Sequence, residues 1–244
     1  MKCLIISDIH LKTKMFEMAD KILEAGLADC AIQMGDLVDD WGEGYNISLY
    51  ERTMQRAIRF HKDHPNTLWC VGNHDFGYDY PNMGVKESGH SQFCEGVMGT
   101  YLREMERIEA KRRIIHIVDD VIFTHAGLTR QWAERRLKKV GYKQGVIPAQ
   151  ENLIHVVNYA TTDELWQEDS PIWVRPQVDD YEMYPAKLQV VGHTPVKTAG
   201  QDNGVLSTDT FSTYRNGAPY GDQTFAIVDT ETGEWTIVEE DKWL

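Results

Sequence analysis

The sequence lacks several features that would assign it to common classes of protein. It contains four cysteines but no pair with Cys-x-x-Cys spacing, which argues against a thiolate zinc site. No segment approaches the roughly 20 consecutive apolar residues of a membrane span. Basic residues are few: 25 Lys and Arg stand against 38 Asp and Glu, giving a formal net charge of −13. Such a charge repels nucleic-acid backbones and anionic membranes, so we expect no duplex binding and no membrane attachment.

The remaining composition is that of a globular protein. Hydrophobic residues make up 42% of the 244 residues, which excludes a disordered or collagen-like chain. No linker, repeat or low-complexity segment interrupts the chain, so we expect one domain over residues 1–244. The N-terminal apolar run is too short for a signal peptide and reads as a first strand. We expect a reducing, cytoplasmic setting in which most of the cysteines are buried apolar side chains: Cys3, Cys30, Cys70 and Cys94.

Apolar runs alternate with segments of helical periodicity, as in an α/β protein. Residues 76–99 show little periodicity, and residues 162–185 are acidic and aromatic, so neither segment predicts a regular element. The expected strands are Lys2–Ser7, Cys30–Met34, Thr67–Val71, Ile114–Val118, Val121–Thr124 and Leu188–Val191, with a hairpin of Phe225–Asp229 and Trp235–Glu239. The expected helices are Lys14–Ala25, Leu49–His61, Thr100–Lys111, Leu128–Lys139 and Ala149–Tyr159.

Five polar clusters each follow an expected strand. In order along the chain they are Asp8-Ile9-His10, Gly35-Asp36-Leu37-Val38-Asp39, Gly72-Asn73-His74-Asp75, Thr124-His125-Ala126-Gly127 and Gly192-His193-Thr194-Pro195. In open α/β sheets the carboxyl ends of the strands converge on one crevice. Carboxylate, imidazole and amide oxygen together suit Mn, Fe, Zn or Ni. One such cluster alone would be ordinary turn chemistry, but five in order predict a metal site.

The clusters resemble the motifs of the calcineurin-like metallophosphoesterase superfamily: D-x-H, G-D-x-x-D, G-N-H-[DE], an isolated His, and G-H. Within it, residues 35–39, 123–128 and 191–195 resemble the phosphoprotein-phosphatase branch, with its bacterial and phage serine/threonine phosphatases and diadenosine tetraphosphatases. The resemblance implies a four-layer α/β/β/α sandwich of two mixed sheets, with metal ions at one rim.

Carried over residue by residue, the resemblance also implies the site. Two divalent ions are expected, with Mn²⁺ the first choice and Fe, Zn or Ni as alternatives. The implied ligands are Asp8 and His10 for the first ion, Asp36 for both, and Asn73, His125 and His193 for the second. His74 would protonate the leaving oxygen as general acid. Asp39 would orient His74 and keep it protonated, a task that Asp75 could share.

Three positions depart from the family patterns. Asp40 stands where the phosphoprotein phosphatases usually have a phosphate-binding arginine, and Asp75 where they usually have Glu. We expect Arg175 to replace the missing arginine, because a guanidinium can hold two phosphate oxygens, with Arg215 as a second candidate. Pro195 replaces the second His of many phosphodiesterases, which favours monoesters or dinucleotides over diesters as substrates.

The sequence therefore predicts a dinuclear-metal-dependent phosphoesterase that hydrolyses phosphate monoesters by attack of a metal-bridging hydroxide. A phosphoprotein Ser/Thr phosphatase is one form of this activity, and the expected partner is an anionic phosphorylated small molecule, nucleotide or phosphoprotein. The alternative is a diadenosine polyphosphate or nucleotide pyrophosphohydrolase, with aromatic residues of 76–84 and 166–184 stacking on a base. A non-catalytic scaffold is disfavoured, because all six implied ligands and the general acid are present.

Overall fold

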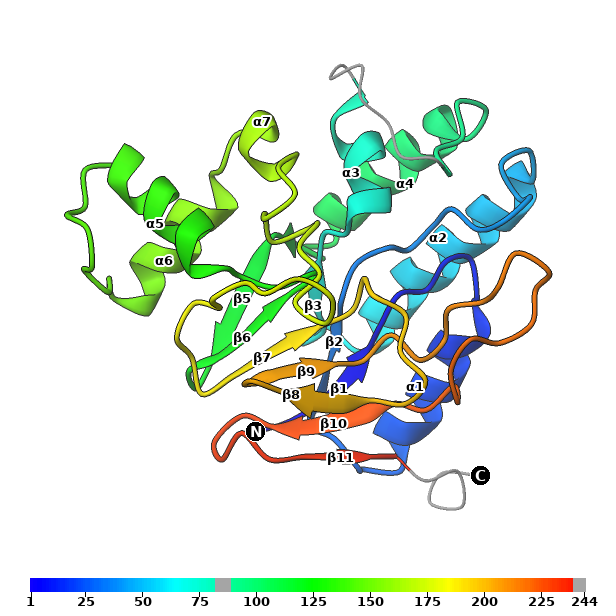
Figure 1. Ribbon diagram of the computed structural model, residues 1–244. Coiled ribbons are helices and arrows are strands. Elements are labelled where there is room, and N and C mark those ends of the chain that lie inside the picture. The colour runs from blue at the N-terminus through cyan, green and yellow to red at the C-terminus, as the bar shows by residue number, and fades with distance from the viewer. Residues whose placement is uncertain (82–88, 239–244) are drawn as a thin grey trace.

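Two mixed β-sheets form the centre of the molecule (Figure 1). The computed structural model describes residues 1–81 and 89–238. In that part of the chain, the first sheet has six strands in the order β11 (Trp235–Ile237), β10 (Ala226–Asp229), β1 (Lys2–Ile6), β2 (Cys30–Gln33), β3 (Leu68–Cys70) and β4 (Arg112–Arg113). The second has five, in the order β5 (Ile115–Val118), β6 (Val121–Thr124), β7 (Leu188–Val191), β9 (Val205–Ser207) and β8 (Gly200–Asp202). The central strands of each sheet are parallel; antiparallel strands border both edges of the second sheet but only the β10–β11 edge of the first, because β4 pairs parallel with β3.

Strand β1 shows why the layers stack as they do. Successive side chains of a strand point to opposite faces. Leu4 and Ile6 belong to a core beneath helices, whereas Cys3 and Ile5 belong to a core that also contains Val121 and other residues of the second sheet. Both faces are therefore buried, and β1 is an unbroken apolar run, as expected for an interior strand.

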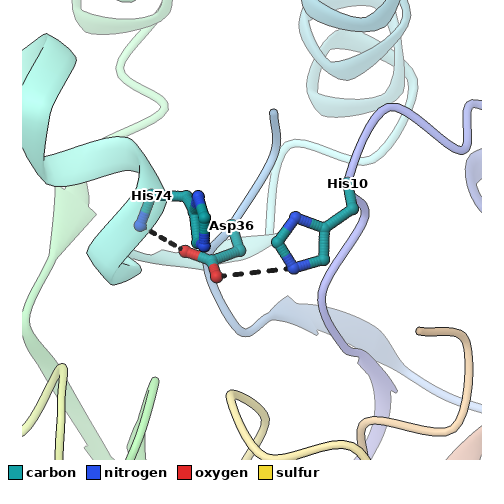
Figure 2. A group of neighbouring side chains, drawn as sticks. All are labelled: His10, Asp36 and His74. Carbon is teal, nitrogen blue, oxygen red and sulfur yellow. Dashed lines mark hydrogen bonds and ion pairs between the residues drawn. The ribbon is translucent and has the colours of Figure 1, made fainter. Parts of the chain in front are cut away.

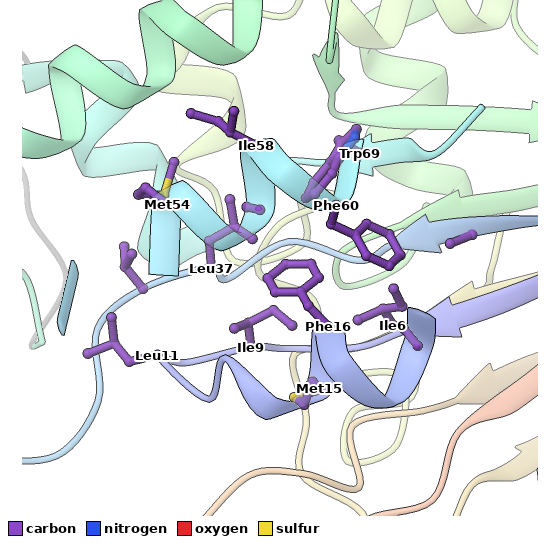
Figure 3. Close-up of a cluster of buried hydrophobic side chains, with 14 of the residues drawn as sticks. Ile6, Ile9, Leu11, Met15, Phe16, Leu37, Met54, Ile58, Phe60 and Trp69 are labelled. Atoms are coloured by element: carbon purple, nitrogen blue, oxygen red, sulfur yellow. The ribbon is translucent and has the colours of Figure 1, made fainter. Parts of the chain in front are cut away.

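Helices cover the outer face of each sheet. Figure 1 shows α1 (Lys14–Glu24) and α2 (Ile47–Asp63) on one side of the molecule and α5 (Arg130–Lys139) and α6 (Gln150–Asn158) on the other. Figure 3 shows Phe16 of α1 and Phe60 of α2 meeting over the first sheet beside Trp69. α4 (Glu95–Arg107) joins α2 on the same core. The predicted α/β/β/α sandwich is confirmed.

Most expected elements are present with shifted ends, and the misses are short elements. The sequence did not predict α3 (Asn73–Asp79), α7 (Thr162–Leu165), β4, β8 or β9. α3 begins inside a polar cluster and contains a glycine, so its seven residues show no periodicity. α4 begins at Glu95 rather than at Thr100. Residues 82–88 of the unassigned stretch, and Glu239 of the predicted last strand, lie outside the described residues.

Two expectations about the whole chain can be compared with the structure. All four cysteines are buried and free, as predicted. Among the residues that the structure describes, no helix is both long enough and apolar enough to span a membrane.

Candidate metal centre and active site

The loops that follow β1, β2, β3, β6 and β7 bring the six implied metal ligands together: Asp8, His10, Asp36, Asn73, His125 and His193. Asp36 lies at the centre of the group. Its Oδ2 is 3.6 Å from Nε2 of His10 and 3.4 Å from Nε2 of His125. One carboxylate oxygen therefore faces imidazoles from both sheets, which is the arrangement that a bridging ligand requires.

The donor atoms form two groups that share Asp36. The first contains His10, Asp36 and His74, and the second contains Asp36, His125 and His193, each within 4.8 Å. Figure 2 shows the Asp36 carboxylate with one oxygen toward the His10 ring and the other toward the backbone N–H of His74, 2.9 Å away. Asp8 lies slightly farther out, with its Oδ2 4.0 Å from Nε2 of His10.

Backbone carbonyls orient the three histidines of the implied ligand set. Each places one ring nitrogen against a carbonyl: His10 Nδ1 against Asp39 (2.7 Å), His125 Nδ1 against Met34 (2.9 Å) and His193 Nε2 against Trp173 (3.1 Å). A carbonyl only accepts, so that nitrogen carries the proton and the other carries a lone pair. All three lone pairs then belong to the ring nitrogens that face the site, which is how metal-binding histidines are held.

The lone pairs of the second group face other acceptors. Nε2 of His125 is 3.2 Å from Nδ1 of His193 and 2.8 Å from Oδ1 of Asn73. Burial lowers the pKa of both imidazoles, so they are neutral near pH 7. Neutral acceptors this close repel one another unless a cation lies between them. Their chemistry, oxygen and imidazole nitrogen, fits a divalent transition metal.

A buried cluster of carboxylates points to the same conclusion. Burial raises the pKa of Asp8, and the charges of Asp209 and Asp36 raise it further. A cation at the site would remove this penalty. Asp209 was not predicted. It follows β9, a three-residue strand within a Ser- and Thr-rich segment that shows no apolar run, so no strand end marked it.

The site residues adopt a backbone conformation that costs free energy. Five non-glycine residues around it have positive φ: His10 (41°), Leu11 (65°), Asp36 (52°), Asp39 (65°) and His193 (61°). Such residues persist only where the surroundings hold them. The carbonyl of Asp36 does so here by accepting the amides of Ile9 (2.9 Å) and His10 (3.0 Å), which ties the loops after β1 and β2 together.

Two motif glycines are required for close approach. A Cβ at Gly72 would collide with the carboxylate of Asp36, and a Cβ at Gly192 would collide with that of Asp8. These glycines allow the backbone that follows β3 and β7 to pass directly over the two carboxylates. The glycines of the G-N-H and G-H motifs are therefore part of the site's geometry.

His74 and Asp39 form the predicted pair. Nδ1 of His74 is 3.3 Å from Oδ2 of Asp39, whose side chain is fully buried. The hydroxyls of Tyr50 and Tyr78 each donate to Oδ1 of Asp39 at 2.6 Å. Burial and the charge of Asp39 raise the pKa of both phenols, so they remain donors. Neither tyrosine was predicted, because each is distant in sequence and lies on a helix.

The structure gives Asp75 a different task from the predicted one of sharing the orientation of His74. Its carboxylate accepts the backbone N–H groups of Asp36 (2.9 Å), Leu37 (2.9 Å) and Gly72 (3.1 Å). It also pairs with buried Arg112 at 3.1 Å. Asp75 thus fastens the loop after β2 to the start of α3 and fixes where Asp36 lies.

A cavity of about 510 Å³ opens over these residues. Arg175 lines it, and its Nη1 is 3.2 Å from Oγ1 of Thr194 and 3.5 Å from the carbonyl of His193. Arg215 is exposed and is not among the described residues that line the cavity. It lies in a turn that is closed by pairing of Thr213 with Pro219, and only the base of that turn reaches the cavity. The structure therefore brings Arg175, but not Arg215, to the site.

Comparison with known proteins identifies the class. The chain belongs to the calcineurin-like phosphoesterase family, whose sequence model matches residues 1–220. It is a hydrolase that acts on phosphoesters, and its family depends on two metal ions. The phosphoprotein-phosphatase branch within this family is not distinguished by the match.

Solved structures resemble this chain at low sequence identity, and the first of them shares its fold. A mutant of a cold-active protein tyrosine phosphatase is 16% identical, with a TM-score of 0.58 over 98% of this chain and 80% of that one. A metallophosphoesterase from Sphaerobacter thermophilus is 17% identical, with a TM-score of 0.47 over 98% of this chain and 88% of that one. Comparison with curated protein sequences gives no match.

Proposed function

We propose that the chain is a dinuclear-metal-dependent phosphatase that hydrolyses phosphate monoesters, phosphorylated serine and threonine among them. The observation that carries the proposal is the position of Asp36. A single oxygen, Oδ2, lies between Nε2 of His10 at 3.6 Å and Nε2 of His125 at 3.4 Å. Two cations held about 3.5–4 Å apart need an anionic bridge to offset their repulsion.

The chain's own residues divide the work. Asp8, His10 and Asp36 would hold one ion, and Asp36, Asn73, His125 and His193 the other. When bound, the two ions supply the positive charge that stabilises the transferred phosphoryl group and activates the attacking water. The proton for the leaving oxygen comes from His74, which lines the cavity.

Asp39 prepares His74 for that role. Its buried carboxylate holds Nδ1 of the ring and favours the protonated imidazole. Tyr50 and Tyr78 in turn hold Asp39 in place and satisfy its other oxygen. The remaining ring nitrogen of His74 can then carry the proton that the leaving group takes.

Two residues support a monoester as the substrate. Arg175 lines the cavity with a guanidinium that can contact two outer oxygens of a phosphate, and a monoester leaves those oxygens unsubstituted. Pro195 also lines the cavity, at the position where a second histidine would offer another donor. The first metal position therefore stays open to a phosphate that carries its full charge.

The test is a hydrolysis screen in Mn²⁺ with an aryl phosphate, a bis-aryl phosphodiester, a phosphopeptide and a diadenosine polyphosphate. We expect the aryl phosphate and phosphopeptide to have the highest kcat/KM and chelation to abolish turnover. Activity that survives chelation, or a preference for the diester, would contradict the proposal. His155→Asn, on the exposed surface of α6, is a control that should leave activity intact.

Trp41 favours a second candidate, the hydrolysis of dinucleoside polyphosphates. Its indole lines the cavity and is 59% exposed, so it can stack on a nucleobase. Several of the predicted stacking residues are instead packed: Phe76 lies against Trp166 with ring centroids 5.7 Å apart, and Tyr184 is buried. Tyr80 is exposed but is not among the described residues that line the cavity. Residues 82–84 of the other segment lie outside the described residues.

Substitution of Trp41 separates the two candidates. If a nucleobase stacks there, Trp41→Ala should lower kcat/KM for diadenosine polyphosphate about 5–150-fold, using roughly 1–3 kcal/mol per stacked base. The aryl phosphate should be hydrolysed as before. If Trp41→Ala changes kcat/KM equally for both substrates, or for neither, the second candidate is removed. Tyr159→Ala, a 70% exposed aromatic on the far side of the second sheet, is the matched control.

A further inference from the structure

We propose that Lys12 binds the phosphate group of the substrate and that Asp40 positions it. Together with Arg175, this ammonium would let the site select a terminal phosphate with two ionised oxygens over a diester with one. The inference rests on the proposed phosphatase function and adds a binding residue to it.

Asp40 places a negative charge in the cavity, and the ammonium of Lys12 offsets it. Its carboxylate lines the same cavity as His74 and Arg175, where it would repel an incoming phosphate. Nζ of Lys12 is 3.1 Å from Oδ2 of Asp40. The pair is partly screened from solvent, because each side chain is only about one-fifth exposed, 21% and 22%. The ammonium therefore offsets a negative charge at the entrance to the metal site.

The contacts of Lys12 also hold it in one place. Its Nζ lies 3.3 Å from the carbonyl of His10, an implied metal ligand. The backbone N–H of Trp41 donates to Oδ1 of Asp40 at 2.8 Å and fixes the carboxylate to which Lys12 is paired. Leu11, with its positive φ of 65°, turns the chain between His10 and Lys12. An ammonium restrained in this way needs little further ordering when a ligand arrives.

A donor remains for the substrate. An ammonium has three N–H groups. Among the described residues, Asp40 and the carbonyl of His10 accept two of them. The third can reach a phosphate oxygen in the cavity that Lys12 lines.

Lys12 and Arg175 lie in loops that contact different sheets. Lys12 follows β1 of the first sheet, and Arg175 contacts the backbone at His193, which follows β7 of the second. Both line the cavity, so a phosphate at the metal site can meet positive charge from either sheet. A monoester dianion offers an ionised oxygen to each cation, whereas a diester has only one negative charge to share.

The experiment uses the full chain loaded with Mn²⁺. Calorimetry measures binding of inorganic phosphate, and kcat/KM is measured for an aryl phosphate and for a bis-aryl phosphodiester. Lys12→Met should weaken phosphate binding and lower kcat/KM for the monoester roughly 10–150-fold, with a smaller loss for the diester. Lys12→Gln, which keeps a polar end on the side chain but removes the charge, should give the same loss. Lys14→Met removes the same charge from an exposed residue outside the cavity and should change neither measurement.

A double variant separates phosphate binding from neutralisation of Asp40. If Lys12 only cancels that carboxylate, Lys12→Met with Asp40→Asn will recover wild-type phosphate affinity, and the proposal is wrong. If Lys12 contacts the phosphate, the double variant stays weak. Wild-type affinity in both Lys12 variants would also overturn the proposal. A wild-type chain that hydrolyses no monoester would instead refute the proposed function, while a loss of phosphate binding in Lys12→Met would still support the contact.

Discussion

The floor and the rim of the cavity are built by different means. The metal-site floor consists of Asp8, His10, Asp36, Asn73, His125 and His193, and the cavity rim of Lys12, Asp40, Trp41 and Arg175. All floor residues except His10 are buried, whereas exposure on the rim ranges up to 59% at Trp41. Backbone groups hold the floor: Asp8 accepts the amide of His193 at 3.1 and 3.0 Å. On the rim, side chains also hold one another, as in the pair of Lys12 and Asp40.

The expected loss of activity on substitution depends on whether a residue belongs to the floor or to the rim. A floor side chain has no water to replace a lost partner, so its removal leaves buried polar atoms unsatisfied. A rim side chain is partly solvated, and its loss removes one contact to the substrate. Floor variants should therefore cost far more activity than rim variants.

The largest effect is expected for Asp36→Asn. The amide removes the charge that two cations would share, so metal affinity should fall and activity should drop by orders of magnitude with the fold retained. Metal analysis, circular dichroism and turnover test this. Asp63→Asn, a 51% exposed carboxylate on α2, is the control. Two bound metal ions and normal turnover in Asp36→Asn would show that the floor does not depend on this bridge.

His74→Asn should be the next most severe. It removes the proposed proton donor, and a general acid contributes about 10²–10⁴-fold. The loss should be greatest for poor leaving groups and smaller for an activated aryl phosphate, which needs less protonation. His74 also lies in the group with His10 and Asp36, so metal content is measured alongside. Equal losses on both substrates, or lost metal, would assign His74 to the floor as a ligand.

Removal of the metal ions by chelation should lower the Tm of the protein, and the size of this shift should depend on the floor residues and not on the rim residues. A ligand at 100 times its Kd adds about 2.7 kcal/mol of stability, which for a chain of this size is a Tm shift of roughly 5–10 °C. Scanning calorimetry with and without chelator measures the shift. Arg175→Ala should show the full Tm shift on chelation, whereas Asp36→Asn should show only a small shift. An identical Tm in both conditions would mean that the facing acceptors of the floor tolerate an empty site.

The smallest of these effects belongs to Arg175→Ala. A hydrogen bond to an ionised group contributes roughly 1.5–3 kcal/mol, so kcat/KM should fall roughly 10–150-fold with metal content unchanged. Arg175→Lys should recover little if two oxygens are held at once. Arg215→Ala, which tests the residue placed outside the cavity, should have no effect. The reverse ranking of the two arginines would mean that the rim extends to the turn around Thr213.

Sequence reasoning performed unevenly across the two regions. The polar clusters that contain the floor residues were found because each comes shortly after an apolar strand, and the family resemblance then implied their role as metal ligands. On the rim it proposed Arg175, which lines the cavity, but it also proposed Arg215, which does not, and it noted Asp40 only as a missing arginine. Short elements such as α3 and β9 were missed because three to seven residues carry too little periodicity.

The sequence alone therefore determined the α/β architecture and placed the polar clusters that contain the floor residues after the ends of strands. Alternating apolar runs specify strands, and a polar residue at the end of a strand is placed at the sheet edge whatever the rest of the chain does. The tertiary structure alone decided which other residues contact those site residues and hold them in place. Asp39 meets Tyr50 and Tyr78 because helices pack beside the first sheet, and Asp8 faces Asp209 because the two sheets pack together. Lys12 meets Asp40 because the loops after the neighbouring strands β1 and β2 lie side by side. Such pairs are separated by 11 to about 200 positions, and no local pattern records a contact that packing creates.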